Sequence, residues 1–117
     1  MVAAFLDIQP INPGHVLVIP VQHSPYLEDL APETGANIFK VAQLIAKAIR
    51  RSSVKSEGVN LFLADGAAAG QEVFHSHLHV FPRFDGDGFG LNLSEKYFQK
   101  PSRKDLDEFA LKIRRNL

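Results

Sequence analysis

One segment of this chain, residues 32–51, has the pattern of a long amphipathic helix, and that helix limits what the rest of the chain can form. Five apolar side chains share one face at helical spacing: Ile38, Val41, Ala42, Ile45 and Ile49. Pro32 suits the first helical position, and basic residues near position 51 suit the C-terminal end of the helix dipole. Such a helix is stable mainly when another element covers its apolar stripe. We therefore expect it to pack on a sheet formed by the apolar runs on either side of it.

Short apolar runs separated by turn residues predict the strands of that sheet. The expected strands cover residues 2–8, 15–20, 58–64 and 73–83. A short helical turn is expected over 26–30 and a second helix over 102–117, where Ser102 and Asp105 resemble a capping box. The elements together predict an α+β fold with helices on a sheet.

The composition is that of one globular domain, and its balanced charge gives no attraction to nucleic acid. The 117 residues, 45% of them hydrophobic and 22% charged, are expected to form a single domain, 1–117. Thirteen basic residues balance thirteen acidic ones, so no overall field attracts a nucleic acid polymer or an anionic membrane. No apolar stretch approaches the ~20 residues of a membrane span. The chain has no cysteine, which suits a reducing compartment, and we expect a soluble, cytoplasmic protein.

Three of the five histidines alternate along one short run. If residues 73–83 form a strand, His75, His77 and His79 share one face. The opposite face would hold Phe74, Ser76, Leu78 and Val80 and could pack against the helices. Near pH 7 one imidazole can act as a nucleophile while a neighbour donates a hydrogen bond or a positive charge to an anion. This arrangement fits chemistry on a phosphate group.

The segment before the histidines, residues 65–71, is a loop of small residues with glycine near both ends. Its backbone N–H groups are open to a phosphate, although an ordinary turn has the same composition. Two other interpretations of the histidines stay open from the residues alone. One is a half-exposed strand that happens to be rich in histidine. The other is a zinc site, because His-x-His on a strand supplies two ligands, although no cysteine and no obvious carboxylate completes the set.

Two segments of the chain resemble the motifs of the histidine triad (HIT) family. Residues 70–83 are similar to the signature His-φ-His-φ-His-φ-φ, in which φ is apolar and Ser76 is the one exception here. Residues 5–20, from Phe-Leu-Asp to Val-Ile-Pro, resemble the family's other diagnostic stretch, in the same order and spacing. The motifs lie within 3–84, and residues 85–117 would add a C-terminal loop and helix. The resemblance implies an antiparallel sheet of about four to five strands with one long helix and a C-terminal helix.

The resemblance also implies a reaction and the residues that perform it. The family's members are nucleotide phosphate hydrolases or nucleotidyl transferases, and His77 would attack the α-phosphorus and carry the nucleotide covalently. Water would then release a nucleoside monophosphate. His75 and His79 would steady the phosphate and the tautomer of the nucleophile, and His15 would orient them from behind.

A second group of residues would bind the nucleotide. Asp7 stands at the family's ribose-contacting position, because a carboxylate has two acceptor oxygens for a sugar diol. Further contacts are expected from Ile8, Gly70, Gln71 and the backbone of Glu72 and Val73. An adenosine- or guanosine-type substrate is expected, such as a purine nucleoside phosphoramidate or a diadenosine polyphosphate.

The sequence departs from the family pattern at three places. Ala64 stands where several members place Asn or Gln, so one amide contact to the ligand is absent. Glu72 stands where others carry Ser or Thr, and its carboxylate would repel phosphate unless it points away. The family's hairpin before the Phe-Leu-Asp stretch is not found in this sequence. Its absence predicts an open base pocket or low activity.

The expected partners follow from the same resemblance. A homodimer is expected, because further apolar side chains widen the surface of the long helix beyond one stripe. They are Ala36, Phe39, Leu44, Ala46 and Ala48. No cofactor is required for the covalent step, although a divalent cation can accompany a polyphosphate. The alternatives are a non-catalytic nucleotide-binding or scaffold protein, and a metal-dependent β-protein that uses the histidine cluster as ligands.

Overall fold

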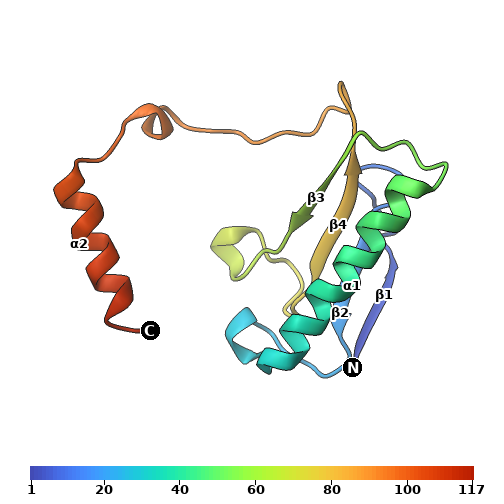
Figure 1. Cartoon of the computed structure of the whole chain (residues 1–117), viewed down its shortest axis with the longest axis horizontal. Helices are drawn as coiled ribbons and strands as arrows, with labels where there is room; N and C mark the ends of the chain where they lie inside the picture. Colours follow the sequence, from blue (N-terminus) through green and yellow to red (C-terminus); the bar gives the residue numbers. More distant parts are fainter.

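A computed structural model describes all residues, 1–117, and shows an α+β fold in which one long helix lies across a four-stranded antiparallel sheet (Figure 1). The strands, in the spatial order β1-β2-β4-β3, are β1 (Val2–Leu6), β2 (Val16–Pro20), β3 (Gly58–Phe62) and β4 (Leu78–Arg83). The helices are α1 (Pro32–Arg51) and α2 (Arg103–Arg114), with short 3₁₀ turns η1 (Leu27–Asp29), η2 (Ala67–Ala69) and η3 (Glu95–Phe98). None of these helices is both long enough and apolar enough to cross a membrane. The fold class expected from the sequence is confirmed.

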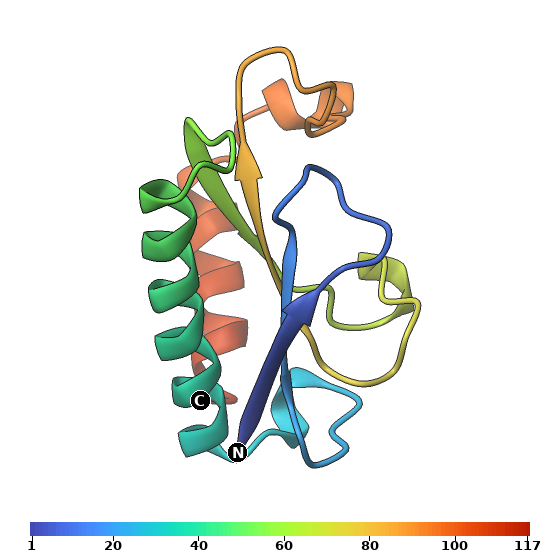
Figure 2. The same ribbon diagram turned by 90° about the vertical axis from the view of Figure 1, so that its right-hand side faces the viewer.

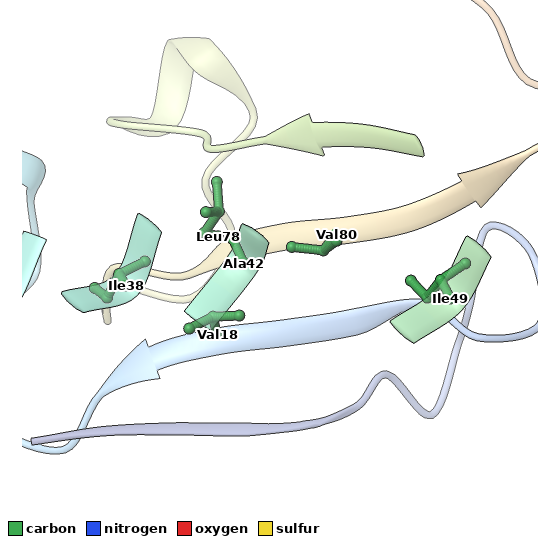
Figure 3. Close-up of a cluster of buried hydrophobic side chains, with 6 residues drawn as sticks. All are labelled: Val18, Ile38, Ala42, Ile49, Leu78 and Val80. Atoms are coloured by element: carbon green, nitrogen blue, oxygen red, sulfur yellow. The ribbon is translucent and has the colours of Figure 1, made fainter. Parts of the chain in front are cut away.

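The core lies between α1 and the two central strands. Val18 of β2 pairs with Leu78 of β4, and both are buried under α1. Figure 3 shows the six residues of this cluster: Val18, Ile38, Ala42, Ile49, Leu78 and Val80. Because strand side chains alternate, His79 and its partner Leu17 lie on the face of the sheet away from α1. The loops between the strands gather on that same side (Figure 2).

The expected strand over 73–83 is wrong in its first half, because β4 begins only at Leu78. The preceding residues bond to a neighbouring loop instead of to a strand ladder. The Ser76 N–H donates to the Ser24 carbonyl at 2.7 Å, and the Gln71 side chain donates to the Pro25 carbonyl at 2.7 Å. His75 and His77 therefore lie on an irregular segment, and only His79 belongs to a strand.

The first strand is also shorter than expected, since β1 ends at Leu6 and not at Ile8. The Asp7 carboxylate accepts the Gln9 N–H at 2.9 Å and so turns the chain out of the sheet. The long helix has the predicted bounds, 32–51. The short helical turn predicted over 26–30 corresponds to η1.

The C-terminal segment forms an arm that leaves the body of the molecule. Figure 1 shows α2 apart from the sheet, on the side of β3. No residue of α2 is buried, and the radius of gyration is 16.9 Å, compared with about 13 Å for a compact chain of this length. One half of the predicted capping box is present, because the Ser102 side chain accepts the Asp105 N–H at 3.1 Å, whereas the Asp105 carboxylate makes no bond to the Ser102 N–H. The helix stops at Arg114, short of the predicted 117.

We expect Gly14→Ala to destabilise the fold, because Gly14 turns the chain into β2 with φ +98°. A Cβ atom there would lie 2.9 Å from Cγ1 of Val54. The combination of left-handed backbone and close contact should lower the free energy of unfolding by about 1–3 kcal/mol. Urea unfolding followed by circular dichroism measures it. Gly58→Ala is the matched control, because nothing lies within 4 Å of its added Cβ, and equal losses in both variants would contradict the expectation.

Candidate active site

The predicted catalytic side chains meet on the open face of the sheet, near the ends of β2 and β4. His15 precedes β2 and is 2% exposed, whereas His79 lies within β4 and is partly exposed. Asp7 follows β1, and its Oδ2 lies 3.8 Å from Nε2 of His15. The rings of His77 and His79 stand edge to face, with their centroids 4.9 Å apart. The structure thus brings together residues that are up to 72 positions apart in the sequence, from Asp7 to His79.

A chain of hydrogen bonds fixes the tautomers of His15 and His79. The Ile11 N–H donates to Nδ1 of His15 at 3.1 Å, so the proton of the neutral ring is on Nε2. That Nε2–H donates to Nδ1 of His79, 2.8 Å away. His79 must then carry its own proton on Nε2. The chain therefore starts at a backbone amide and presents an N–H group of His79 that has no partner in the protein.

The other two histidines are each held by a backbone carbonyl. Nδ1–H of His77 donates to the His75 carbonyl at 2.6 Å, which leaves the lone pair of the His77 Nε2 free. Nε2–H of His75 donates to the Pro20 carbonyl at 2.7 Å, at the end of β2. Each ring thus keeps one unprotonated nitrogen, which is what a nucleophile requires, but only His77 also lines the polar cavity beside Asp7 and His79.

Burial keeps two of these rings neutral. Desolvation, together with the neighbouring His77 and His15, lowers the pKa of His79 from 6.5 to about 4. Burial also lowers the pKa of His15, although the Asp7 carboxylate acts in the opposite direction. Near pH 7 His79 is therefore a neutral hydrogen-bond donor and not a cation.

Two cavities meet at His77. A polar one of about 290 Å³ is lined by Asp7, Gln9, Leu17, Gly70, Glu72, Val73, His77 and His79. An apolar one of about 380 Å³ is lined by Phe5, Leu17, Ile19, Val73, His75 and His77. The two cavities share Leu17, Val73 and His77. A ligand with one polar and one apolar part, as a nucleotide has, would match this division.

Two of the predicted nucleotide contacts lie outside both cavities. The Gln71 side chain is buried, and its amide donates to the Pro25 and Val73 carbonyls while its oxygen accepts the Gly66 N–H. Ile8 is fully exposed, at 101% of its reference area. Contact between these residues and a nucleotide stays a prediction.

The sequence reasoning missed an apolar group and an anchoring network. Phe5, Leu17 and Ile19 line the apolar cavity, and their alternation with the α1-facing residues of β1 and β2 was the signal that could have identified them. Asn12 donates to the Asp87 carboxylate at 2.8 Å and to the Pro82 carbonyl at 2.9 Å. These two bonds tie the turn before His15 to the end of β4.

Asp87 is the centre of that network. Its carboxylate accepts hydrogen bonds from Nε and Nη2 of Arg83 at 2.6 and 3.0 Å. The bonded Arg83 guanidinium lowers the pKa of Asp87, and Asp87 in turn raises the pKa of Arg83. His23, which had no predicted role, is exposed, and its ring lies beside that of His75 at a centroid distance of 5.4 Å.

One trio of residues could hold a metal ion, and it differs from the trio considered from the sequence. The ligating atoms of Asp7, His15 and His79 all lie within 4.8 Å of one another. A metal bound there would replace the proton between His15 and His79. His77 is not part of this group, so its nitrogen remains free in either case.

Comparison with known proteins identifies the family. The sequence model of the HIT domain family matches residues 1–86 of this chain. The chain belongs to the HIT family. A HIT family protein from Bacillus anthracis has the same fold, with a TM-score of 0.86 and 38% identity over 99% of this chain and 82% of that one.

Two related HIT proteins are enzymes by name. The adenylylsulfatase HINT3 of Arabidopsis thaliana is 34% identical over all of this chain and 59% of its own length. The asymmetrical bis(5'-nucleosyl)-tetraphosphatase of Schizosaccharomyces pombe is 43% identical over 73% of this chain and 46% of its own. A zinc-bound histidine triad family protein from Mycobacterium smegmatis matches with a TM-score of 0.70 and 43% identity over 87% of this chain and 69% of that one. The HIT family thus includes nucleotide hydrolases and a member that binds zinc.

The lowered pKa of His79 predicts a pH-dependent stability for this HIT protein. The unfolded ring takes up a proton near pH 6.5, but the folded ring does so only near pH 4. Stability should be constant above pH 6.5 and should fall as the pH drops from 6.5 toward 4, by about 1–2 kcal/mol for a partly screened ring. Urea unfolding at a series of pH values measures this fall.

The variant His79→Asn tests the assignment, because the Asn oxygen takes nearly the place of Nδ1 and still accepts from His15. The fall between pH 6.5 and 4 should become smaller in this variant and stay unchanged in the control His23→Asn. A fall of the same size in His79→Asn would show that another group causes it.

Proposed function

We propose that this HIT protein hydrolyses nucleotides, or transfers nucleotidyl groups, by attack of His77 on the α-phosphorus. The observation that supports this most directly is the bond from His77 Nδ1–H to the His75 carbonyl at 2.6 Å. It leaves Nε2 unprotonated at the junction of a polar and an apolar cavity. A nucleophile that is already held in one tautomer and one orientation loses less entropy on reaching the transition state.

The reaction would proceed in two displacements. In the first, Nε2 of His77 forms a bond to the α-phosphorus, and the bond from phosphorus to the leaving group breaks. The ring becomes positively charged, and the His75 carbonyl stabilises that charge through the Nδ1–H bond. In the second displacement, water attacks the nucleotidyl-histidine, loses a proton, and releases the nucleoside monophosphate. An acceptor other than water would make the same enzyme a transferase.

The remaining residues would bind and orient the nucleotide. The free Nε2–H of His79 would donate to a phosphate oxygen, and loss of one such donor typically costs about 10²–10³ in rate. His15 would keep His79 in this tautomer, and Asp7 would accept from the ribose hydroxyls. Phosphate contacts from Gly70 and from the backbone of Glu72 and Val73 belong to the same proposal.

The substrate that fits is a purine nucleotide with a cleavable group on its α-phosphate. Phe5 and Leu17 offer the base an apolar surface near Asp7. A purine nucleoside phosphoramidate, a diadenosine polyphosphate or a similar compound has the required parts. The two enzyme relatives support hydrolysis at a nucleotide phosphate, although this chain spans about half of each one's length. The cytoplasmic location expected from the composition stays a prediction.

His77→Ala should abolish turnover, with a loss of at least about 10³ in kcat, because no other imidazole that lines the polar cavity has a free unprotonated nitrogen. The measurement is release of nucleoside monophosphate from a purine nucleoside phosphoramidate. Acid quenching of the wild type with α-³²P-labelled substrate should trap label on the protein, and His77→Ala should trap none.

The matched control is His23→Ala, which removes an exposed imidazole next to the site and should keep kcat within about twofold. More than about a tenth of the wild-type rate in His77→Ala would remove the covalent role. Nucleotide binding without turnover in the wild type would favour the non-catalytic alternative.

A metal-dependent activity is the second candidate, and the grouping of Asp7, His15 and His79 is the observation that favours it. The covalent mechanism needs no metal, although a divalent cation can neutralise a polyphosphate substrate. Excess chelator should therefore leave phosphoramidate hydrolysis unchanged. Loss of activity that zinc restores would favour the metal site.

We also propose that two copies form a homodimer, and that residues 1–117 form one domain whose arm packs on the second copy. β3 is an edge strand, and Leu61 and Phe62 on it are exposed. On α1, Phe39 and Leu44 are 56% and 66% exposed. An edge strand and large exposed apolar side chains on a helix are both liabilities in a monomer.

The dimer is tested by its mass in light scattering coupled to gel filtration, which should be twice the 13.0 kDa of one chain. The double variant Phe39→Glu, Leu44→Glu should shift the protein toward the monomer, because the charges would be buried in the interface. Ending the chain at residue 101 should weaken the dimer as well. Val21→Glu, an exposed apolar residue beyond β2, is the control. A wild-type mass of one chain would overturn the dimer.

A further inference from the structure

The cavity that would receive the phosphate and the leaving group contains no cationic side chain. No lysine or arginine is among the residues that line either cavity at His77. The polar cavity instead has two carboxylates, Asp7 and Glu72. Burial lowers the pKa of His79 to about 4, so this ring adds no positive charge near pH 7. A substrate that brings several negative charges would meet no fixed counter-charge here.

The two carboxylates differ in what they bond to. The Asp7 carboxylate accepts the Gln9 N–H at 2.9 Å and lies 3.8 Å from Nε2 of His15. Its negative charge is therefore already partly compensated within the protein. Glu72 is exposed, and its carboxylate makes no hydrogen bond and no ion pair within the chain. It lines the same cavity as His77 and Gly70, away from the apolar cavity. Its negative charge is therefore available to whatever occupies the polar cavity.

We propose that Glu72 makes the enzyme select its substrate by the charge of the leaving group, favouring nucleoside phosphoramidates whose leaving amine carries a second, positively charged amino group. The inference rests on the proposed function, because it concerns the group that His77 displaces. The phosphorus–nitrogen bond breaks as the bond from His77 Nε2 to phosphorus forms, and the amine leaves with a proton taken from solvent. Water then attacks the nucleotidyl-histidine, displaces His77 and returns a proton to solvent. Glu72 attracts the distant ammonium group of that amine and repels polyphosphate leaving groups.

The size of the effect follows from Coulomb's law. A carboxylate and an ammonium group about 6 Å apart in an open cavity of high dielectric give a preference of about three- to tenfold. The preference should decrease with added salt, because the Debye length falls from about 10 Å at 0.1 M to about 3 Å at 1 M. A preference based on packing would not change in this way.

The experiment compares two adenosine 5'-phosphoramidates, one of 1,4-diaminobutane and one of pentylamine, which match in length and differ in charge. The readout is the ratio of kcat/KM for the two substrates. The wild type should prefer the diaminobutane compound about three- to tenfold at low salt. Glu72→Gln should bring the ratio close to one, and Glu72→Lys should bring it below one. Glu108→Gln, on the exposed helix α2, is the matched control and should keep the wild-type ratio.

Diadenosine tetraphosphate provides the anionic comparison. Its kcat/KM relative to that of the pentylamine compound, measured without divalent cations, should rise in Glu72→Gln and rise further in Glu72→Lys. A ratio for the two phosphoramidates that is the same in the wild type and both Glu72 variants would overturn the role of Glu72 and leave the proposed function intact. Release of no nucleoside monophosphate from any of the three substrates would overturn the proposed function and this inference together.

Discussion

The packing of α1 on β2 and β4 determines where the chemistry of this protein can lie. Val18, Leu78 and Val80 are buried beneath the helix. In an antiparallel sheet the residues between them must face the other way, so His79 and Leu17 are directed to the open face. A shift of one residue in the register of β4 would bury the imidazole and expose the core. The hydrophobic contacts that stabilise the fold therefore also determine on which face of the sheet the candidate active site lies.

The hydrogen bond between His15 and His79 determines which ring atom of His79 is presented on the open face of the sheet. It connects the residue just before β2 to the second residue of β4, and its direction follows from the backbone amide that donates to Nδ1 of His15. Burial acts with it, because a neutral ring can accept one hydrogen bond and donate another, which an imidazolium cannot. His77 is held in the opposite tautomer by the His75 carbonyl. Two neighbouring imidazoles thus present a donor and a lone pair to the same cavity.

The sequence predicted the long helix, the presence of four strands along the chain and the histidine cluster, because each depends on a local periodic pattern. It could not predict that residues 73–77 leave the strand, since that depends on Ser76 bonding to Ser24, some 50 positions earlier. The Asn12, Asp87 and Arg83 network was missed for the same reason. The arm was predicted as a helix but not as a detached one. An amphipathic helix of 12 residues is marginal by itself in water, which is why we propose that it packs on the second copy.

A site built from neutral imidazoles and carboxylates must stabilise negative charge differently from one lined with arginine. Fixed cations attract a phosphate in the ground state as well as in the transition state, so part of their interaction energy goes into binding and not into rate. In the proposed mechanism the donors to the phosphate would be N–H groups whose positions are set by backbone bonds, and such groups act most strongly on charge that develops where they point. We therefore expect a lower affinity for polyphosphates than a site lined with arginine would have. Under this proposal, discrimination between substrates would depend on the charged groups that line the polar cavity, and Glu72 is the one that makes no hydrogen bond or ion pair within the chain.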